Sequence, residues 1–249
     1  MLVPLANLGL QPGSPRYDQI LQDASTVQDP VSQVAIMRDL ARVAMEGDAR
    51  AGACLAACLQ DEHGHIRRAA VCALEKAALK GSPKALEVVS LRLRDPSWRV
   101  RQAAAEAVGA VAIRGDRGAI AELTALLEDA EAGVRGAAVL GLSQVAGPND
   151  RDVVAALAEC LEDPDGYVRG AAVQALPRVA GRGDEVALSE VLARLEHPDW
   201  LVQRAAARAL AKVAAGGNER ALAAFDECVH GAGGVGPPAG TLAVARAAL

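Results

Sequence analysis

Histidine and cysteine are the residue types in this chain that could bind a metal or act as nucleophiles, so their spacing is the first test for chemistry. The chain has 249 residues, with four histidines and five cysteines. The histidines are His63, His65, His197 and His230. Cys54 and Cys58 are four residues apart and would share one face of a helix. That pair could hold a metal or be oxidised, but two small buried side chains are the simpler interpretation.

The chain repeats itself, which allows these residues to be placed relative to one another. Residues 95–108 read DPSWRVRQAAAEAV, and similar copies occupy 61–74, 129–142 and 163–176, each 34 residues from the next. A more divergent copy, HPDWLVQRAAARAL, occupies 197–210. Self-similarity at a fixed period of this length is typical of a solenoid, in which each repeat packs on its neighbours.

The repeat separates the residues that could do chemistry. Three cysteines share one repeat position, two or more repeats apart: Cys58, Cys160 and Cys228. Equivalent helices of adjacent repeats pack about 10 Å apart, so these thiols are roughly 20 Å or more from one another. A disulfide needs Cα atoms within about 7 Å. The histidines of the second repeat lie four repeats from His197 and cannot share a metal with it. We predict reduced cysteines, no metal site and no cofactor.

Each repeat carries the signals for two helices. The first, the A helix, begins at a capping residue preceded by a glycine or, once, by Asn149. These starts are Asp48, Ser82, Asp116, Asp150, Asp184 and Asn218, and Ser14 precedes a helix expected over 15–23. The second, the B helix, follows the Asp-Pro-type turn. Its apolar residues, for example Val100, Ala104 and Val111, form one buried stripe.

These signals predict an all-α fold, an α-solenoid (right-handed superhelix) of antiparallel helix pairs with a 34-residue period. We expect a leader over 1–13 and the solenoid over 14–230, with seven A helices and six B helices. Residues 231–249 are expected to form a flexible Gly/Pro segment and a short capping helix that closes the open core.

The turn before each B helix carries a family resemblance. Its Asp is followed five and six residues later by Val-Arg, as in Asp95, Val100 and Arg101, and this pattern recurs at a fixed period. The pattern resembles the HEAT-repeat family, in the compact form known as PBS-lyase HEAT-like repeats, over residues 14 to about 230. The resemblance implies that the B helices line a concave surface and that the Asp and Arg residues form a buried ladder.

The implied ladder is consistent with physical chemistry, since a partly desolvated guanidinium needs a carboxylate partner. Its members are Asp61, Arg67, Asp95, Arg101, Asp129, Arg135, Asp163 and Arg169, all assigned a structural role. In the last full repeat His197 replaces the Asp and Gln203 replaces the Arg. We interpret this as the end of the ladder and, because both charges are lost together, expect no stranded charge.

The expected concave surface is basic, although the chain has a net charge of −5 and a pI near 5.5. That overall charge has the wrong sign for a general nucleic-acid binder. Two acidic residues, Glu75 and Glu106, face the same surface, and the fourth repeat contributes the uncharged Gly136, Ser143 and Gln144. The predicted partner-binding residues are Arg38, Arg42, Arg68, Lys76, Leu140, Arg178, Arg204, Arg208 and Lys212. The alternative is that these charges only keep the helices soluble.

Three aromatic residues are predicted to line one rim of the solenoid. Trp98 and Trp200 share a repeat position, and Tyr167 lies one place further along its repeat. An exposed tryptophan is a common interface hot spot. The alternative is that these rings pack on the adjacent turn.

The residues that known enzymes of this scaffold use have no counterpart in this sequence. Deoxyhypusine hydroxylases use His-Glu dipeptides, which are absent here. HEAT-like DNA glycosylases need a basic cleft with aromatic and Asp groups, and no residue identifies a bilin lyase. We predict a non-catalytic scaffold or assembly subunit, not an enzyme, that binds an acidic or extended protein segment on the concave face. The alternatives are a nucleic-acid-binding HEAT-like protein and a HEAT-like enzyme or tetrapyrrole-handling protein.

The chain contains no apolar run of 18 or more residues, which predicts no membrane span. Residues 1–13 lack the basic start of a signal peptide. We expect an intracellular, soluble protein, cytoplasmic by default, or organellar if a targeting peptide has been removed. The expected partners are proteins, in a larger complex, and not nucleic acid.

Overall fold

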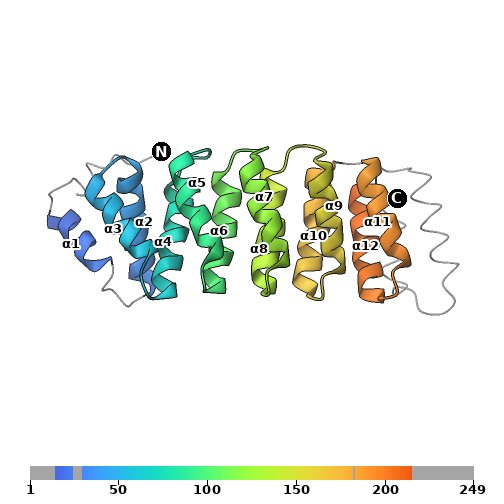
Figure 1. Cartoon of the computed structure of the whole chain (residues 1–249), viewed down its shortest axis with the longest axis horizontal. Helices are drawn as coiled ribbons and strands as arrows, with labels where there is room; N and C mark the ends of the chain where they lie inside the picture. Colours follow the sequence, from blue (N-terminus) through green and yellow to red (C-terminus); the bar gives the residue numbers. More distant parts are fainter. Residues whose placement is uncertain (1–14, 25–29, 182, 215–249) are drawn as a thin grey trace. The chain divides into compact units, whose positions relative to one another are not determined.

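The computed structural model describes residues 15–24, 30–181 and 183–214, and these residues form helix pairs and contain no strand (Figure 1). The A helices are α1 (Pro15–Asp23), α3 (Ala49–Leu59), α5 (Pro83–Ser90), α7 (Arg117–Ala125), α9 (Arg151–Glu159) and α11 (Glu185–Ala193). The B helices are α2 (Pro30–Met45), α4 (Gly64–Ala77), α6 (Trp98–Val111), α8 (Ala132–Val145), α10 (Gly166–Val179) and α12 (Trp200–Val213). Short 3-10 turns follow α5, α7, α9 and α11, at Leu91–Arg94, Leu126–Glu128, Cys160–Glu162 and Arg194–Glu196.

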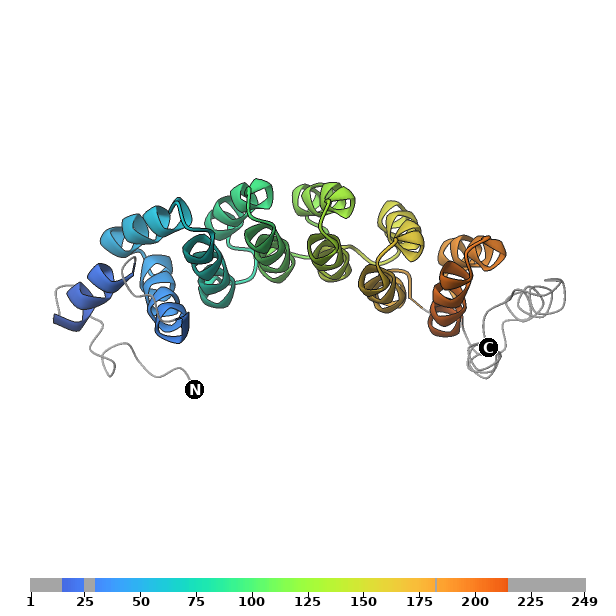
Figure 2. The same cartoon turned by 90° about the horizontal axis from the view of Figure 1, so that it is seen from below.

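The described helices belong to two compact units, one ending at Ile113 and one beginning at Arg114. Within the first, α3 and α5 form one layer and α2, α4 and α6 another; within the second, α7, α9 and α11 face α8, α10 and α12 in the same way (Figure 2). The predicted solenoid of helix pairs is confirmed. The domain bounds stay a prediction, because residues 1–13, the A helix after Asn218 and residues 231–249 lie outside the described residues.

The A helices begin where the capping residues predict. The Asp116 carboxylate accepts hydrogen bonds from the backbone N–H groups of Gly118 and Ala119 at 3.0 and 3.1 Å. Before it, Gly115 has a φ of 85°, in the left-handed region that glycine adopts without strain. Asn149 takes the same region, with a φ of 56°, where the other repeats place glycine. The predicted role of Asn149 is confirmed.

A recurring backbone hydrogen bond ties each repeat to the next. The Gly81 N–H, before α5, donates to the carbonyl oxygen of Val111 at the end of α6, at 2.6 Å. In the second unit Gly115 bonds Val145 in the same way at 2.6 Å. The loop before an A helix is therefore anchored to the end of the following B helix.

The core consists of Ala, Val and Leu side chains from both layers. The stripe predicted for the B helices is confirmed in α6, where Val100, Ala104 and Val108 are fully buried. Small side chains on these stripes let neighbouring B helices approach closely. The opposite side of the B helices therefore lies at the surface of each unit.

Candidate partner-binding site on the B helices

A buried ion pair joins α4 to the turn before α6. Arg67 donates from Nε and Nη2 to the two carboxylate oxygens of Asp95, at 2.7 and 2.8 Å. Its Nη1 donates to the carbonyl oxygens of Asp61 and Glu62 at 2.7 and 3.0 Å. The side chains of the pair are only 10% and 2% exposed. We call this arrangement a closed rung: one Arg binds its own turn and the Asp of the next repeat.

The closed rung keeps both groups charged. Burial raises the pKa of the Asp95 carboxyl, but hydrogen bonds from Arg67 and from the Ser97 N–H outweigh it, and the net pKa is lowered. The hydrogen bond to Asp95 in turn raises the pKa of Arg67. Neither group therefore changes charge near neutral pH.

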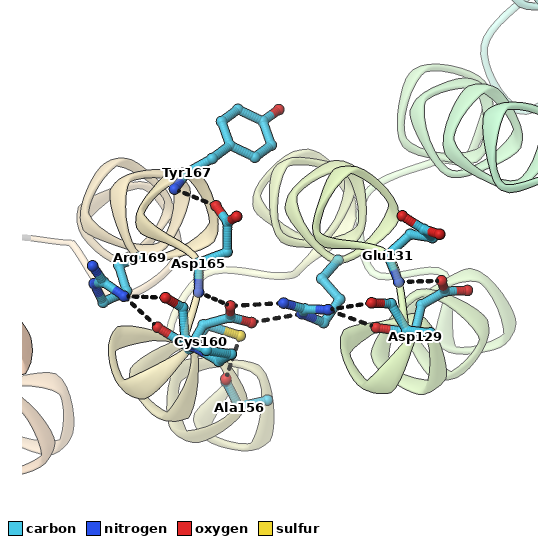
Figure 3. A network of polar contacts seen from close by, with 11 residues as sticks. Asp129, Glu131, Ala156, Cys160, Asp165, Tyr167 and Arg169 are labelled. Atoms are coloured by element: carbon cyan, nitrogen blue, oxygen red, sulfur yellow. Dashed lines mark hydrogen bonds and ion pairs between the residues drawn. The ribbon is translucent and has the colours of Figure 1, made fainter.

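A second closed rung lies between α8 and the turn before α10 (Figure 3). Arg135 donates to the two carboxylate oxygens of Asp163 at 2.7 and 2.8 Å, and its Nη1 donates to the carbonyl oxygen of Asp129 at 2.8 Å. The Asp163 carboxylate also accepts from the Asp165 N–H at 2.7 Å. As for Asp95, burial alone would raise the pKa of the Asp163 carboxyl. The hydrogen bonds from Arg135 and from the Asp165 N–H have the larger effect, so the net pKa is lowered.

Two more predicted ladder residues bind within their own turns. Arg101 donates from Nη1 to the carbonyl oxygens of Asp95 and Pro96 at 2.9 and 3.3 Å. The Asp61 carboxylate accepts from the His63 N–H at 2.8 Å and lies 3.0 Å from the ring Nδ1 of the same histidine. Each side chain thus stabilises the turn that leads into a B helix.

The last described turn keeps this geometry without its charges. The Nδ1 atom of His197 accepts a hydrogen bond from the Asp199 N–H at 3.0 Å, as the Asp carboxylates do in the other turns. Gln203 donates from Nε2 to the His197 carbonyl oxygen at 2.8 Å, as the Arg side chains do. The two replacements therefore preserve the turn.

The expectation that no charge is stranded here is wrong. Arg67 and Arg135 each pair with the Asp of the following repeat, and the same register assigns His197, not an Asp, to Arg169. Arg169 donates from Nη1 to the carbonyl oxygens of Asp163 and Pro164 at 2.6 and 2.8 Å (Figure 3). Its Nε and Nη2 have no acceptor among the described residues, although the residue is only 9% exposed. We call this the open rung.

The open rung borders a small groove between α10 and α12. Here Arg169, Arg204 and Arg208 line a cavity of about 40 Å³, together with Gly166 and Gly170. No carboxylate lines it. The equivalent groove between α4 and α6 has a cavity of about 130 Å³ with Arg68, Gln102 and Glu106. The same place in the two units is therefore purely basic in one and mixed in the other.

A third groove, between α8 and α10, is filled. The Tyr167 ring lies over Gly136, and a Cβ atom at Gly136 would collide with the ring. Ser143 is also buried and donates to the Leu140 carbonyl oxygen at 2.7 Å. The expectation that Gly136 and Ser143 face the open surface is wrong, because a ring from the next repeat and the helix backbone cover them.

Sequence comparison places this ladder in a known family. A family model of HEAT repeats matches residues 17–109, 87–177 and 154–233, which together exceed half of the chain. The chain belongs to the HEAT-repeat family. No curated protein matches the HEAT chain in sequence.

Solved structures resemble this HEAT protein in fold. The YIBA protein of Escherichia coli is 14% identical with a TM-score of 0.57, over 93% of this chain and 90% of that one. The HEAT-like repeats protein of the archaeon Thermococcus onnurineus NA1 is 18% identical with a TM-score of 0.52, over 93% and 94%. A designed armadillo repeat protein in complex with the peptide (KR)4 is 23% identical with a TM-score of 0.52, over 77% and 97%.

The predicted partner-binding residues lie on the B helices of the HEAT pairs. Those exposed to solvent are Arg38, Arg68, Lys76, Arg178, Arg208 and Lys212, and those partly buried are Arg42, Leu140 and Arg204. In the first unit Arg38 lies 3.9 Å from Asp39. In the second unit none of the four basic residues forms an ion pair with a described residue. Their role in binding stays a prediction.

The predicted rim aromatics differ in exposure. Tyr167 is 52% and Trp200 39% exposed, whereas Trp98 is more covered. The Arg99 guanidinium lies 4.6 Å from the ring centre of Trp98, and that of Arg204 lies 5.1 Å from Trp200. Trp98 belongs to the first unit and the other two rings to the second, so the single rim stays a prediction.

An ion-pair cluster next to the open rung was missed in the sequence. Arg194 lies 2.9 Å from the carboxylates of both Glu162 and Glu190. It occupies the repeat position of Cys58, Arg92, Leu126 and Cys160, and a charged residue at a position that elsewhere is mostly apolar is the signal that could have revealed it.

The acidic side chains of the second unit gather on its other side. A cavity of about 470 Å³ beside the Arg135–Asp163 rung is lined by Glu128, Glu159 and Glu162. The B helices of this unit, α8, α10 and α12, contain no carboxylate, whereas its A helices carry charges of both signs, including Arg117 and Arg151.

The described cysteines, Cys54, Cys58, Cys72 and Cys160, are free thiols. A hydrogen bond from Cys58 lowers the pKa of Cys54 to about 7, whereas that bond and burial raise the pKa of Cys58. Burial raises the pKa of Cys160 to about 12. Cys228 lies outside the described residues.

Among the described residues, no three potential ligands are grouped to hold a metal ion. Within the same residues, no helix is both long and apolar enough to span a membrane.

Proposed function

We propose that this HEAT-repeat protein is a non-catalytic binding protein that holds an acidic segment of a protein partner on the B helices of its second unit. One observation carries this proposal. Four basic residues, Arg178, Arg204, Arg208 and Lys212, lie on α10 and α12 without an ion pair to any described residue. Unpaired cations on one face attract and orient an acidic partner.

The surroundings of these cations support a binding surface. Trp200 and Tyr167 are exposed on the same unit and can supply aromatic anchors. Repeat arrays present extended surfaces to partners. The designed armadillo repeat protein of similar fold is in complex with a basic peptide. The face described here would instead bind an acidic peptide, because its own side chains are basic.

A charge-reversal variant tests the proposal. Arg204, Arg208 and Lys212 are changed together to Glu, and a fluorescein-labelled peptide of eight glutamates serves as the probe. We expect the anisotropy Kd to rise at least about tenfold in 50 mM salt, because each rim charge contributes to association. The matched control is Arg38, Arg68 and Lys76 changed to Glu in the first unit, where Asp39, Glu75 and Glu106 already offset the cations. An equal loss in the two triple variants, or none in either, would contradict the proposed site.

The basic face could also bind the phosphate backbone of a nucleic acid, and the same preparation tests this alternative. We expect the wild-type protein to retain the glutamate peptide and not a generic single-stranded DNA at 150 mM salt. Tighter, salt-sensitive retention of the DNA would overturn the proposal in favour of nucleic-acid binding.

A further inference from the structure

We propose that the open rung at Arg169 is a carboxylate subsite, in which an Asp or Glu side chain of the bound partner completes the ladder. This rests on the proposed function and names the contact within it. Arg169 is more than nine-tenths buried, and its Nε and Nη2 face no acceptor among the described residues. The chain supplies no carboxylate for this edge, so an external carboxylate that reaches it can form the charge-assisted pair of hydrogen bonds that the closed rungs make internally.

The cavity at this position suits one carboxylate. Its volume of about 40 Å³ holds a group of one or two water-sized atoms. Arg204 and Arg208 line it from α12, so three of the residues around the space are arginines. A Cβ atom at Gly170 would meet no atom within 4 Å, so this wall leaves open space beside the cavity.

The other B-helix grooves show what normally occupies this place. Between α4 and α6 the chain supplies its own carboxylates, Asp95 on the rung and Glu106 in the groove. Between α8 and α10 Asp163 closes the rung and the Tyr167 ring fills the groove. Of these three grooves, the one between α10 and α12 has no Asp on its rung and neither a Glu nor an aromatic ring in its cavity lining.

The geometry of the closed rungs favours a carboxylate over other anions. In both, Nε and Nη2 of the Arg bind two oxygens of one planar carboxylate at 2.7 and 2.8 Å. Arg169 makes the same Nη1 contacts to its turn as Arg67 and Arg135, so its remaining edge is held for the same planar pair of oxygens. We infer that the partner inserts one acidic side chain here while its flanking residues contact the exposed cations.

Two variants test this subsite with the glutamate peptide. Arg169→Gln keeps a donor for the turn, as Gln203 does naturally at 2.8 Å, but removes the charged edge. His197→Asp supplies a carboxylate from inside the chain at the position of Asp95 and Asp163. We expect both to raise the Kd at least about tenfold, the size of a lost charge-assisted hydrogen-bond pair. His197→Asp should also raise the thermal midpoint, which would show that the rung has closed.

The control is Arg151→Gln, which removes one exposed charge of α9, an A helix outside the proposed binding face; we expect it to change the Kd less than about threefold. If Arg169→Gln and His197→Asp bind like this control while the charge-reversal variant does not bind, the proposed function stands and the subsite is wrong. If the wild-type protein does not bind the glutamate peptide, both are wrong. Tighter binding of a peptide with phosphoserine in place of each glutamate, lost in Arg169→Gln, would overturn the choice of a carboxylate.

Discussion

The groove between α4 and α6 and the groove between α10 and α12 are built from equivalent positions of the repeat but differ in charge. In the first, the ladder Arg67 is closed by Asp95, and Glu106 neutralises the groove. In the second, His197 occupies the repeat position of Asp95, with its Nε2 atom 3.8 Å from the Glu162 carboxylate, and Arg204 and Arg208 replace Gln102 and Glu106. The backbone is the same, and a few side chains decide whether the charge is satisfied within the chain.

The difference teaches that a structural ladder and a binding site can be made from the same residue. A closed rung is an internal ion pair that ties two repeats together. An open rung keeps the guanidinium in position through its carbonyl contacts, at 2.6 and 2.8 Å, but leaves its carboxylate-binding edge available. The comparison predicts that identical substitutions have different consequences in the two grooves.

The largest difference is expected when the ladder Arg is removed. Arg67→Ala leaves the Asp95 carboxylate, whose side chain is 2% exposed, without its cation, and should lower the free energy of unfolding by about 3–5 kcal/mol. Arg169→Ala strands no carboxylate and loses only hydrogen bonds to two carbonyl groups, which should cost about 1–2 kcal/mol. Urea unfolding followed by circular dichroism measures both. Equal losses would show that the two rungs do not differ.

Acid should separate the closed rungs from the open one. The pKa of Asp95 and of Asp163 is lowered in the folded protein. At a pH below the unfolded value, near 4, the unfolded chain binds more protons than the folded chain, so stability falls as the pH falls. The contribution is fully present above that pH and is lost as the pH passes through the folded pKa.

The measurement is the urea midpoint between pH 6 and pH 2, for the wild type and for Asp163→Asn. The variant should start lower at pH 6 and decline less steeply below pH 4, because one titrating rung is missing. Parallel curves would mean that the rung does not contribute to acid unfolding. Arg169→Gln serves as the control, because its rung contains no carboxylate, and its slope should match the wild type.

The sequence predicted the ladder but not its gap, and the reason is the register between repeats. A fixed period and the pairing of Asp with Arg suffice to expect Asp95, Arg67 and their equivalents, because these signals are local. Which Arg meets which Asp depends on how one repeat stacks on the next. The replacement of the Asp by His197 and of the Arg by Gln203 therefore looked like one event within one turn, whereas the register assigns the histidine to the rung of Arg169.

Side-chain orientation limited the prediction in the same way. The helix positions facing the surface were read from the period, which places Gly136 next to solvent. The Tyr167 ring covers that glycine from the following repeat, and no period specifies the rotamer of an aromatic ring. The basic residues of α12 were found because long charged side chains on a helix surface extend into solvent wherever the neighbouring helix lies.

The smallest expected effect compares two glycines at the same position of neighbouring B helices. Gly170 in α10 has open space where a Cβ would lie, so Gly170→Ala should raise the free energy of unfolding by about 0.5–1 kcal/mol through helix propensity alone. Gly136→Ala in α8 gains the same propensity, but its methyl group must displace the Tyr167 ring. Because Tyr167 is 52% exposed, the ring can rotate into solvent without disturbing the core. Its lost contact should cancel the gain, leaving a net change near zero.

Paired urea melts measure the difference, and Tyr167→Ala provides the control, since the two glycine variants should then become equally stabilising. If Gly136→Ala still gains less than Gly170→Ala without the tyrosine, something other than this ring occupies the groove between α8 and α10.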